Sequence, residues 1–271
     1  MKNRICIISF LLFFIIGIHC TTISSAAVAY SGESSHAYSQ FLDSTQLSVY
    51  NQVYQNIINF NEDLFVLDTP IREDDLEDTM NSLFNDHPEL FWVHTSYHYA
   101  IDSSNVVHKV RLNYCITKDE LSQTKAQYDS ALDSLVAEAS KYSTQLEQEK
   151  YLHDEICKMC TYNPYNDMNQ SAYSSLITGS SVCAGYARAF QAACQRLGIN
   201  CYYITGTSMG SKHAWNLVQI DGIYYNVDLT WDDSISESAG IVSYDYFNQD
   251  NETFSIDHSP SKLSSRIVNY I

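Results

Sequence analysis

The stretch KHAWNLVQIDGIYYNVDLTWDD, residues 212–233, contains two runs of alternating apolar and polar residues on either side of Asp221-Gly222. An Asp-Gly pair between two such runs is the strongest short-range signal for a hairpin with a two-residue turn. A turn of this length fixes the register and places Ile220 opposite Ile223. The stretch therefore predicts an antiparallel sheet.

The same register brings a histidine and an aspartate together. If both strands continue, Trp215 lies opposite Asp228 and His213 lies opposite Thr230. His213 and Asp228 are then diagonal neighbours on one face, with Cβ atoms about 7–8 Å apart. An Asp that holds a His in one tautomer is what a thiol nucleophile needs, because the imidazole takes up and returns the proton. Trp215 shares this face and is a candidate for lining the substrate cleft or packing around it, whereas Asn216 points away and is expected to satisfy backbone groups.

A candidate thiol lies upstream, in SVCAGYARAF at residues 181–190. Apolar residues follow Cys183 at helical spacing as far as Gly198, a natural helix end. Ser180 or Ser181 can cap the start of this helix. Cys183 then lies in the first turn, where the helix dipole favours a thiolate. The alternative is a buried structural cysteine. The predicted His213–Asp228 pair makes that alternative the weaker one.

The order Cys, His, Asp in SVCAGYARAFQAACQRLGINCYYITG (181–206) and HAWNLVQIDGIYYNVDLTW (213–231) resembles the transglutaminase-like, papain-related superfamily in its exported bacterial form. The resemblance implies an α+β fold with the catalytic helix packed on an antiparallel β-sheet, preceded by an N-terminal α/β extension. It also implies Cys183 as nucleophile, His213 as base and Asp228 as orienting acid. No feature of the calcium-dependent animal enzymes is found, so no cofactor and no metal are expected.

Six of the eight cysteines lie beyond residue 29, and each could be a free thiol, a disulfide partner or a metal ligand. Cys157-x-x-Cys160 has no second pair at zinc spacing, so two packed thiols are favoured over a metal or redox pair. Cys194 and Cys201 are expected in the core, with a disulfide between them as the alternative.

Other polar and aromatic side chains have simpler interpretations. Tyr186 is expected to pack around the site and is a second candidate for the substrate cleft. His153-Asp154 is expected to contribute structure. The acids Asp232-Asp233 and those of residues 72–78 are interpreted as solvated charge.

The chain is expected to divide into three parts. Lys2, Arg4 and the apolar run 5–18, followed by Ala27-Val28-Ala29, predict an export signal over residues 1–29. Residues 30–140 are expected to form an N-terminal helix, hairpin and helix region, and residues 141–271 the catalytic domain. The predicted elements before residue 181 are a helix over 45–60, a hairpin from the strands at 91–101 and 106–116, and helices over 118–141 and 144–160.

The net charge and the distribution of apolar residues limit the classes of molecule that the protein is expected to bind. The net charge of −17 repels phosphate backbones and argues against nucleic acid. No second apolar span follows the signal, so we expect a protein without a membrane span that is secreted or associated with the cell wall.

These observations lead to three functional hypotheses. The first is an exported acyl-transfer enzyme that acts on peptide or protein amides, cell-wall peptide among them, through a thioester. The second is a cysteine peptidase or amidase with the same triad, since the chemistry is identical up to the thioester. The third is a non-catalytic cell-wall binding module that retains the fold.

Overall fold

The computed structural model describes residues 36–233 and 242–270. The predicted export signal, residues 1–29, lies outside the described residues. The described residues belong to one compact unit by their internal contacts, and the boundary expected near residue 140 stays a prediction. None of the helices described in these two ranges is both long and apolar enough to cross a membrane.

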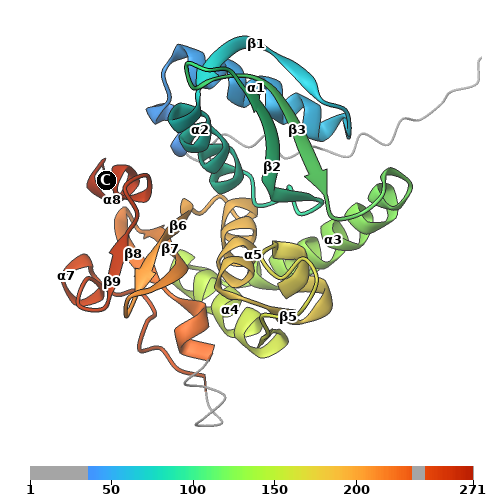
Figure 1. Cartoon of the computed structure of the whole chain (residues 1–271). Helices are drawn as coiled ribbons and strands as arrows, with labels where there is room; N and C mark the ends of the chain where they lie inside the picture. Colours follow the sequence, from blue (N-terminus) through green and yellow to red (C-terminus); the bar gives the residue numbers. More distant parts are fainter. Residues whose placement is uncertain (1–35, 234–241, 271) are drawn as a thin grey trace, which may run out of the picture. The chain divides into compact units, whose positions relative to one another are not determined.

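The elements follow one another in mixed order along the chain (Figure 1). The helices are η1 (Tyr38–Phe41), α1 (Ser44–Ile58), α2 (Glu73–Asp86), α3 (Lys118–Ala139), α4 (Gln145–Met159), η2 (Ser174–Thr178), α5 (Cys183–Arg196), α7 (Asn251–Phe254) and α8 (Ser264–Tyr270). The strands are β1 (Phe65–Arg72), β2 (Val93–Ile101), β3 (Val106–Tyr114), β4 (Thr161–Tyr162), β5 (Ser180–Ser181), β6 (Cys201–Ser208), β7 (Ser211–Ile220), β8 (Ile223–Val227) and β9 (His258–Pro260).

Helix α5 lies at the centre of the C-terminal half. It packs against β6 and β7 on one side and against α3 and α4 on the other (Figure 1). The sheet that it covers has four strands in the order β8-β7-β6-β9, and every neighbouring pair is antiparallel. The expected α+β arrangement, with this helix on an antiparallel sheet, is confirmed.

The Asp221-Gly222 turn forms as predicted. Both residues have positive φ, +50° and +85°, which is the requirement of a type I′ turn. Ile220 pairs with Ile223, and the register continues to the pair Asn216 and Val227. Beyond that pair the prediction is wrong, because β8 ends at Val227 and residues 229–233 are helical. Trp215 and His213 therefore have no strand partners in β8.

The start of α5 differs from the expectation in one respect. Val182 is the N-cap residue, and no side chain caps this helix end. The Ser181 hydroxyl is engaged elsewhere, because it contacts the carbonyl of Asn169 and the hydroxyl of Ser174, both at 2.6 Å. Cys183 is nevertheless the first helical residue, and Gly198 follows the helix end with φ +78°, as predicted.

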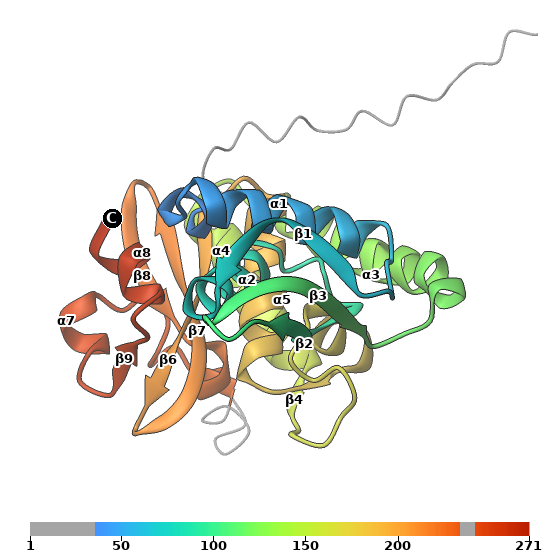
Figure 2. The same ribbon diagram turned by 45° about the horizontal axis from the view of Figure 1, so that its top comes forward.

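The N-terminal half contains a second, three-stranded sheet in the order β1-β3-β2. Helix α2 packs against all three strands, and α1 packs against β1 and α2 (Figure 2). The β2–β3 hairpin was predicted, whereas β1 and α2 were not. One hydrophobic core runs through both halves, since Leu83 of α2, Leu132 of α3 and Phe190 of α5 belong to the same buried cluster.

Candidate active site

His213 and Asp228 meet at the end of the hairpin. The imidazole Nε2 donates to Asp228 Oδ2 at 2.5 Å, and the carboxylate is fully buried. Because the histidine is on β7 and the aspartate directly follows β8, the two side chains come from the two strands that the Asp221-Gly222 turn joins. The predicted pairing is therefore present in the structure.

The aspartate is held by the start of the short helix that ends β8. Asp228 Oδ1 accepts the backbone N–H groups of Thr230 at 3.0 Å and Trp231 at 3.1 Å. An acidic side chain at a helix N-terminus satisfies unpaired donors and benefits from the helix dipole. The Asp228 carboxylate is thus positioned as the cap of this helix. The diagonal strand pairing expected from the register is not what brings Asp228 to His213.

The side chain of Cys183 interacts with the same imidazole. Burial of the His213 ring opposes its protonation, but its interactions with Asp228 and Cys183 outweigh burial and raise the pKa of His213 to about 10. The ring is therefore an imidazolium at neutral pH, beside a thiol group at the N-terminus of α5. Since Nε2 faces Asp228, Nδ1 is the ring atom available to the sulfur.

Small side chains surround the thiol. Cys183 is half-buried and packs with the buried residues Ala184, Ala187 and Ala214 and with the ring of Tyr203. Asn216 fixes the helix to the sheet, because its Nδ2 donates to the carbonyl of Ala187 at 2.9 Å. This is the backbone-satisfying role that was expected for Asn216.

A second histidine, which the sequence did not single out, contacts the same carboxylate. His258 Nε2 donates to Asp228 Oδ2 at 3.0 Å, and its Nδ1 lies 2.5 Å from Asp257 Oδ1. Burial opposes the ionisation of Asp228, but the hydrogen bonds from His213 and His258 outweigh burial and hold the pKa of Asp228 below its ordinary value. His258 reaches this position through β9, a three-residue strand that pairs with β6.

The two aromatic cleft candidates are not at a surface. Trp215 is 2 % exposed and Tyr186 is 0 % exposed. Neither side chain has exposed surface for a substrate to contact, so their prediction as residues that line the substrate cleft is not supported. Both pack in the interior, which was the alternative interpretation. Trp231 is the half-exposed aromatic residue here, with its ring centroid 6.3 Å from that of His213 and its Nε1 donating to Ser208 Oγ.

The interpretation of Asp232-Asp233 as solvated charge is wrong. Asp232 is fully buried and accepts from His153 Nε2 at 3.1 Å, and Asp233 accepts from the Tyr186 hydroxyl at 2.6 Å. Asp232 also accepts the backbone N–H of Tyr246. Helix formation after Asp228 turns both carboxylates into the interior, which residue spacing alone does not reveal.

This network includes a second Cys, His and Asp set. Cys157 Sγ lies 3.9 Å from His153 Nε2, and His153 also contacts Asp154. Burial opposes protonation of the ring, but the hydrogen bonds to Asp154 and Asp232 raise the pKa of His153. Because Cys157, His153 and Asp232 are buried, this set contributes structure and is closed to a substrate.

The six cysteines of the described residues are all free thiols. Cys194 and Cys201 are both buried, so the core interpretation holds and the disulfide between them is absent. Cys157 and Cys160 are buried as well, as packed thiols.

One group of side chains within the described ranges could hold a metal ion. It consists of His213, Asp228 and His258, whose ligating atoms all lie within 4.8 Å of one another. Each of these atoms already takes part in the hydrogen bonds described above. The group therefore coincides with the candidate triad and needs no ion to explain its geometry.

Comparisons with known proteins find a resemblance to the transglutaminase-like superfamily. Residues 133–229 match the model of the transglutaminase-like superfamily, so the chain contains a transglutaminase-like region. It is 28% identical over 162 residues to kyphoscoliosis peptidase of Homo sapiens and 26% identical over 174 residues to that of Mus musculus. These alignments cover 51% and 56% of this chain, but only 24% and 26% of the two relatives. A crystal structure of a transglutaminase has a TM-score of 0.36 and 16% identity, covering 50% of this chain and 44% of that one.

Proposed function

Given a transglutaminase-like region that holds Cys183, His213 and Asp228 together, we propose that this protein is a cysteine-dependent acyl-transfer enzyme. Its substrates are amides of peptides or proteins, cell-wall peptide among them. The observation that carries the proposal is the placement of the His213 ring, which is hydrogen-bonded to the buried Asp228 carboxylate at 2.5 Å and interacts with the Cys183 side chain at the start of α5.

The proposed reaction begins from a thiolate and an imidazolium. The raised pKa of His213 supports this ion pair, since the ring keeps its proton at neutral pH. The Cys183 sulfur attacks the amide carbonyl carbon and the oxygen becomes an oxyanion beside the first N–H groups of α5. When the C–N bond breaks, His213 gives its proton to the leaving amine and a thioester remains. Compared with the role of base implied by the resemblance, His213 acts first as an acid.

The acceptor decides the product. A primary amine that attacks the thioester gives a new amide, whereas water gives a free acid and returns the thiol. Hydrolysis is the second candidate, because the relatives of Homo sapiens and Mus musculus carry the name peptidase. For the acceptor step the neutral His213 formed in the first half takes up the proton of the amine or water.

Incubation with a glutamine peptide and a labelled primary amine separates these candidates. Release of ammonia with incorporation of the label supports transfer; release of ammonia without the label, or cleavage of the peptide, supports hydrolysis. The matched control is Cys157→Ala, which removes a buried thiol outside the site, against Cys183→Ala. No thiol-dependent turnover of any amide by a folded protein, together with tight binding to wall material, would favour the non-catalytic binding module.

Export is part of the same proposal. The first 29 residues have the composition of an export signal, and secretion into the medium or association with the cell wall is expected from it. N-terminal sequencing of the protein recovered outside the cells tests this, with Tyr30 expected as the first residue.

A further inference from the structure

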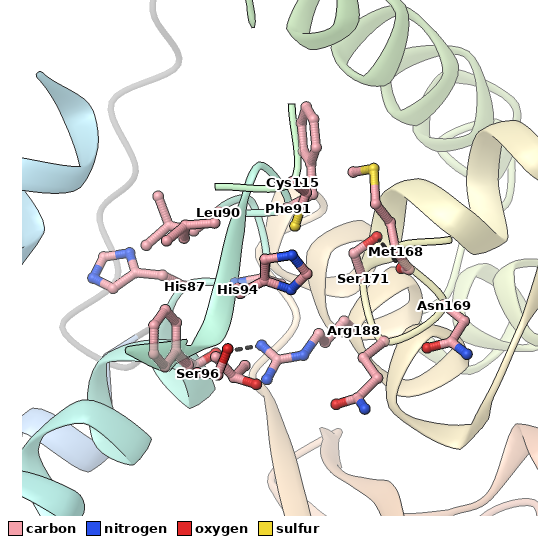
Figure 3. Close-up of a pocket in the computed structure, with 15 residues that line it drawn as sticks. His87, Leu90, Phe91, His94, Ser96, Cys115, Met168, Asn169, Ser171 and Arg188 are labelled. Atoms are coloured by element: carbon pink, nitrogen blue, oxygen red, sulfur yellow. Dashed lines mark hydrogen bonds between the residues drawn. The ribbon is translucent and has the colours of Figure 1, made fainter. Parts of the chain in front are cut away.

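A pocket of about 350 Å³ lies next to the catalytic helix, on the side of the N-terminal half. Its walls are the end of α2, the first part of β2 and residues 168–171, and Arg188 of α5 lines it (Figure 3). None of the described residues that line this pocket is acidic. Arg188 brings a positive charge to this lining, in a chain whose net charge is −17.

Arg188 is a buried cation that has no carboxylate partner among the residues that the structure describes. Its side chain is 9 % exposed, and its guanidinium group donates to the carbonyl of Phe84 and stacks over the Tyr203 ring, with Cζ 4.3 Å from the ring centroid. The described arginine ion pairs are those of Arg196 and Arg266, and no described carboxylate pairs with Arg188. A guanidinium keeps its charge and carries five N–H donors, so Phe84 and Tyr203 satisfy only part of it.

Burial of a charge costs free energy unless an opposite charge or enough hydrogen bonds compensate for it. The Phe84 carbonyl and the Tyr203 ring give partial compensation and explain why Arg188 is held in place. They do not explain why the guanidinium borders a pocket large enough for a ligand. A planar anion that enters the pocket would supply the missing charge.

We propose that this pocket binds a carboxylate group, with the guanidinium of Arg188 as its bidentate hydrogen-bond donor. Guanidinium and carboxylate match in shape and form paired N–H to O hydrogen bonds. The apolar part of the lining, from Leu90, Phe91 and Met168, suits the aliphatic stem of such a ligand. An acidic side chain and a peptide C-terminus both meet this description.

The pocket shares a wall with the catalytic site. The Val182 N–H, just before Cys183, donates to the carbonyl of Asn169, which lines the pocket. Arg188 follows Cys183 by five residues on α5, a separation of about 7.5 Å along the helix axis. The carboxylate site itself does not depend on the proposed reaction, and its test measures binding alone.

The test is an NMR titration of full-length Cys183→Ala protein, which has no nucleophile and therefore no turnover. Three probes are compared: N-acetyl-glutamate α-amide for an acidic side chain, N-acetyl-alanine for a C-terminus, and neutral N-acetyl-glutamine α-amide. We expect one or both acids to shift the Arg188 Nε–H signal and the amides of residues 94–96 and 169–171 in a saturable manner. The neutral probe should bind at least tenfold more weakly. Which acid binds more tightly identifies the source of the carboxylate.

The matched variants place a glutamate inside and outside the pocket. Thr95 is exposed and lines the pocket, whereas Ser103 is exposed in the turn after β2 and does not. Thr95→Glu should abolish binding and Ser103→Glu should leave it unchanged. Arg188→Lys keeps the charge but loses the planar fork, and should weaken binding about tenfold provided that its circular dichroism is unaltered. Equal binding of the neutral probe, saturable shifts that survive Thr95→Glu, or tighter binding of inorganic phosphate would each overturn the proposal.

Discussion

His213 and His258 donate to the same oxygen atom of Asp228, at 2.5 and 3.0 Å. The carboxylate is buried, so these two rings and the backbone N–H groups at Oδ1 account for its environment. Because His258 is itself held by Asp257, acids and imidazoles alternate from Asp257 to His213. In the proposed mechanism His258 would therefore be a positioning residue that acts through Asp228.

Replacement of His258 by Gln should slow turnover without abolishing it. A hydrogen bond to a charged group contributes about 1.5–3 kcal/mol, so we expect kcat/KM to fall roughly tenfold or more. The control is His108→Gln, which removes an exposed histidine bonded to Asp102 at 2.9 Å. Kinetics across pH distinguish positioning from a merely structural role, because loss of His258 should also move the alkaline limb of kcat/KM. An unchanged pH profile with a lowered melting temperature would contradict the positioning role.

The pKa of His213 gives a second prediction. It is raised to about 10 from its ordinary 6.5, so the imidazolium form is lost only as pH rises through that value. The stabilisation from this group should be complete below about pH 6.5 and disappear as pH approaches 10. Activity that needs the imidazolium should show an alkaline limb in the same range.

Asp228→Asn should move this limb toward neutral pH, because the amide no longer stabilises the protonated ring. The turnover number should also fall, since an amide can hold the imidazole in the wrong tautomer. In the equivalent serine arrangement this change costs about 10⁴-fold. The measurement is kcat and kcat/KM from pH 5 to 11. Full activity of Asp228→Ala would remove Asp228 from the mechanism.

Thiol reactivity tests the choice of nucleophile. Cys183 should be the cysteine that iodoacetamide labels fastest near neutral pH, because it is half-buried at a helix N-terminus beside His213. Cys115 is the informative comparison: it is also half-buried, but burial raises the pKa of its thiol to about 11. Mass spectrometry of digests after short exposure measures both rates. Comparable labelling of Cys157 or Cys160 in the folded protein would show that the wrong thiol was chosen.

Because Asp232 belongs to a buried hydrogen-bond network, its replacement should strongly lower the free energy of unfolding. Asp232→Ala leaves the buried Nε2 of His153 without its carboxylate acceptor, and loss of one partner of a buried pair costs about 3–5 kcal/mol. Asp129→Ala breaks an exposed pair with Lys125 and should cost at most about 1 kcal/mol. Urea unfolding of both variants gives the comparison. A difference below the error of the extrapolation would mean that Asp232 is solvated after all.

Local sequence patterns determined much of this fold. The Asp221-Gly222 turn, the helix from Cys183 to Gly198 and the β2–β3 hairpin were all predicted, because turn residues and periodicity act over a few neighbours. The same patterns placed His213 and Asp228 on adjoining segments. They also led to errors, among them the expected serine cap of α5, the extension of β8 past Val227 and the solvated interpretation of Asp232-Asp233.

Only the tertiary structure decided what surrounds the triad. His258 reaches Asp228 from 30 residues away through the pairing of β9 with β6, and Arg188 meets the carbonyl of Phe84 from 104 residues away. Contacts over such separations depend on the packing of whole elements, which leaves no local periodic signal. The sequence thus determined the helix, the hairpin and the three candidate catalytic side chains, whereas packing decided their burial, the second histidine and the pocket beside them.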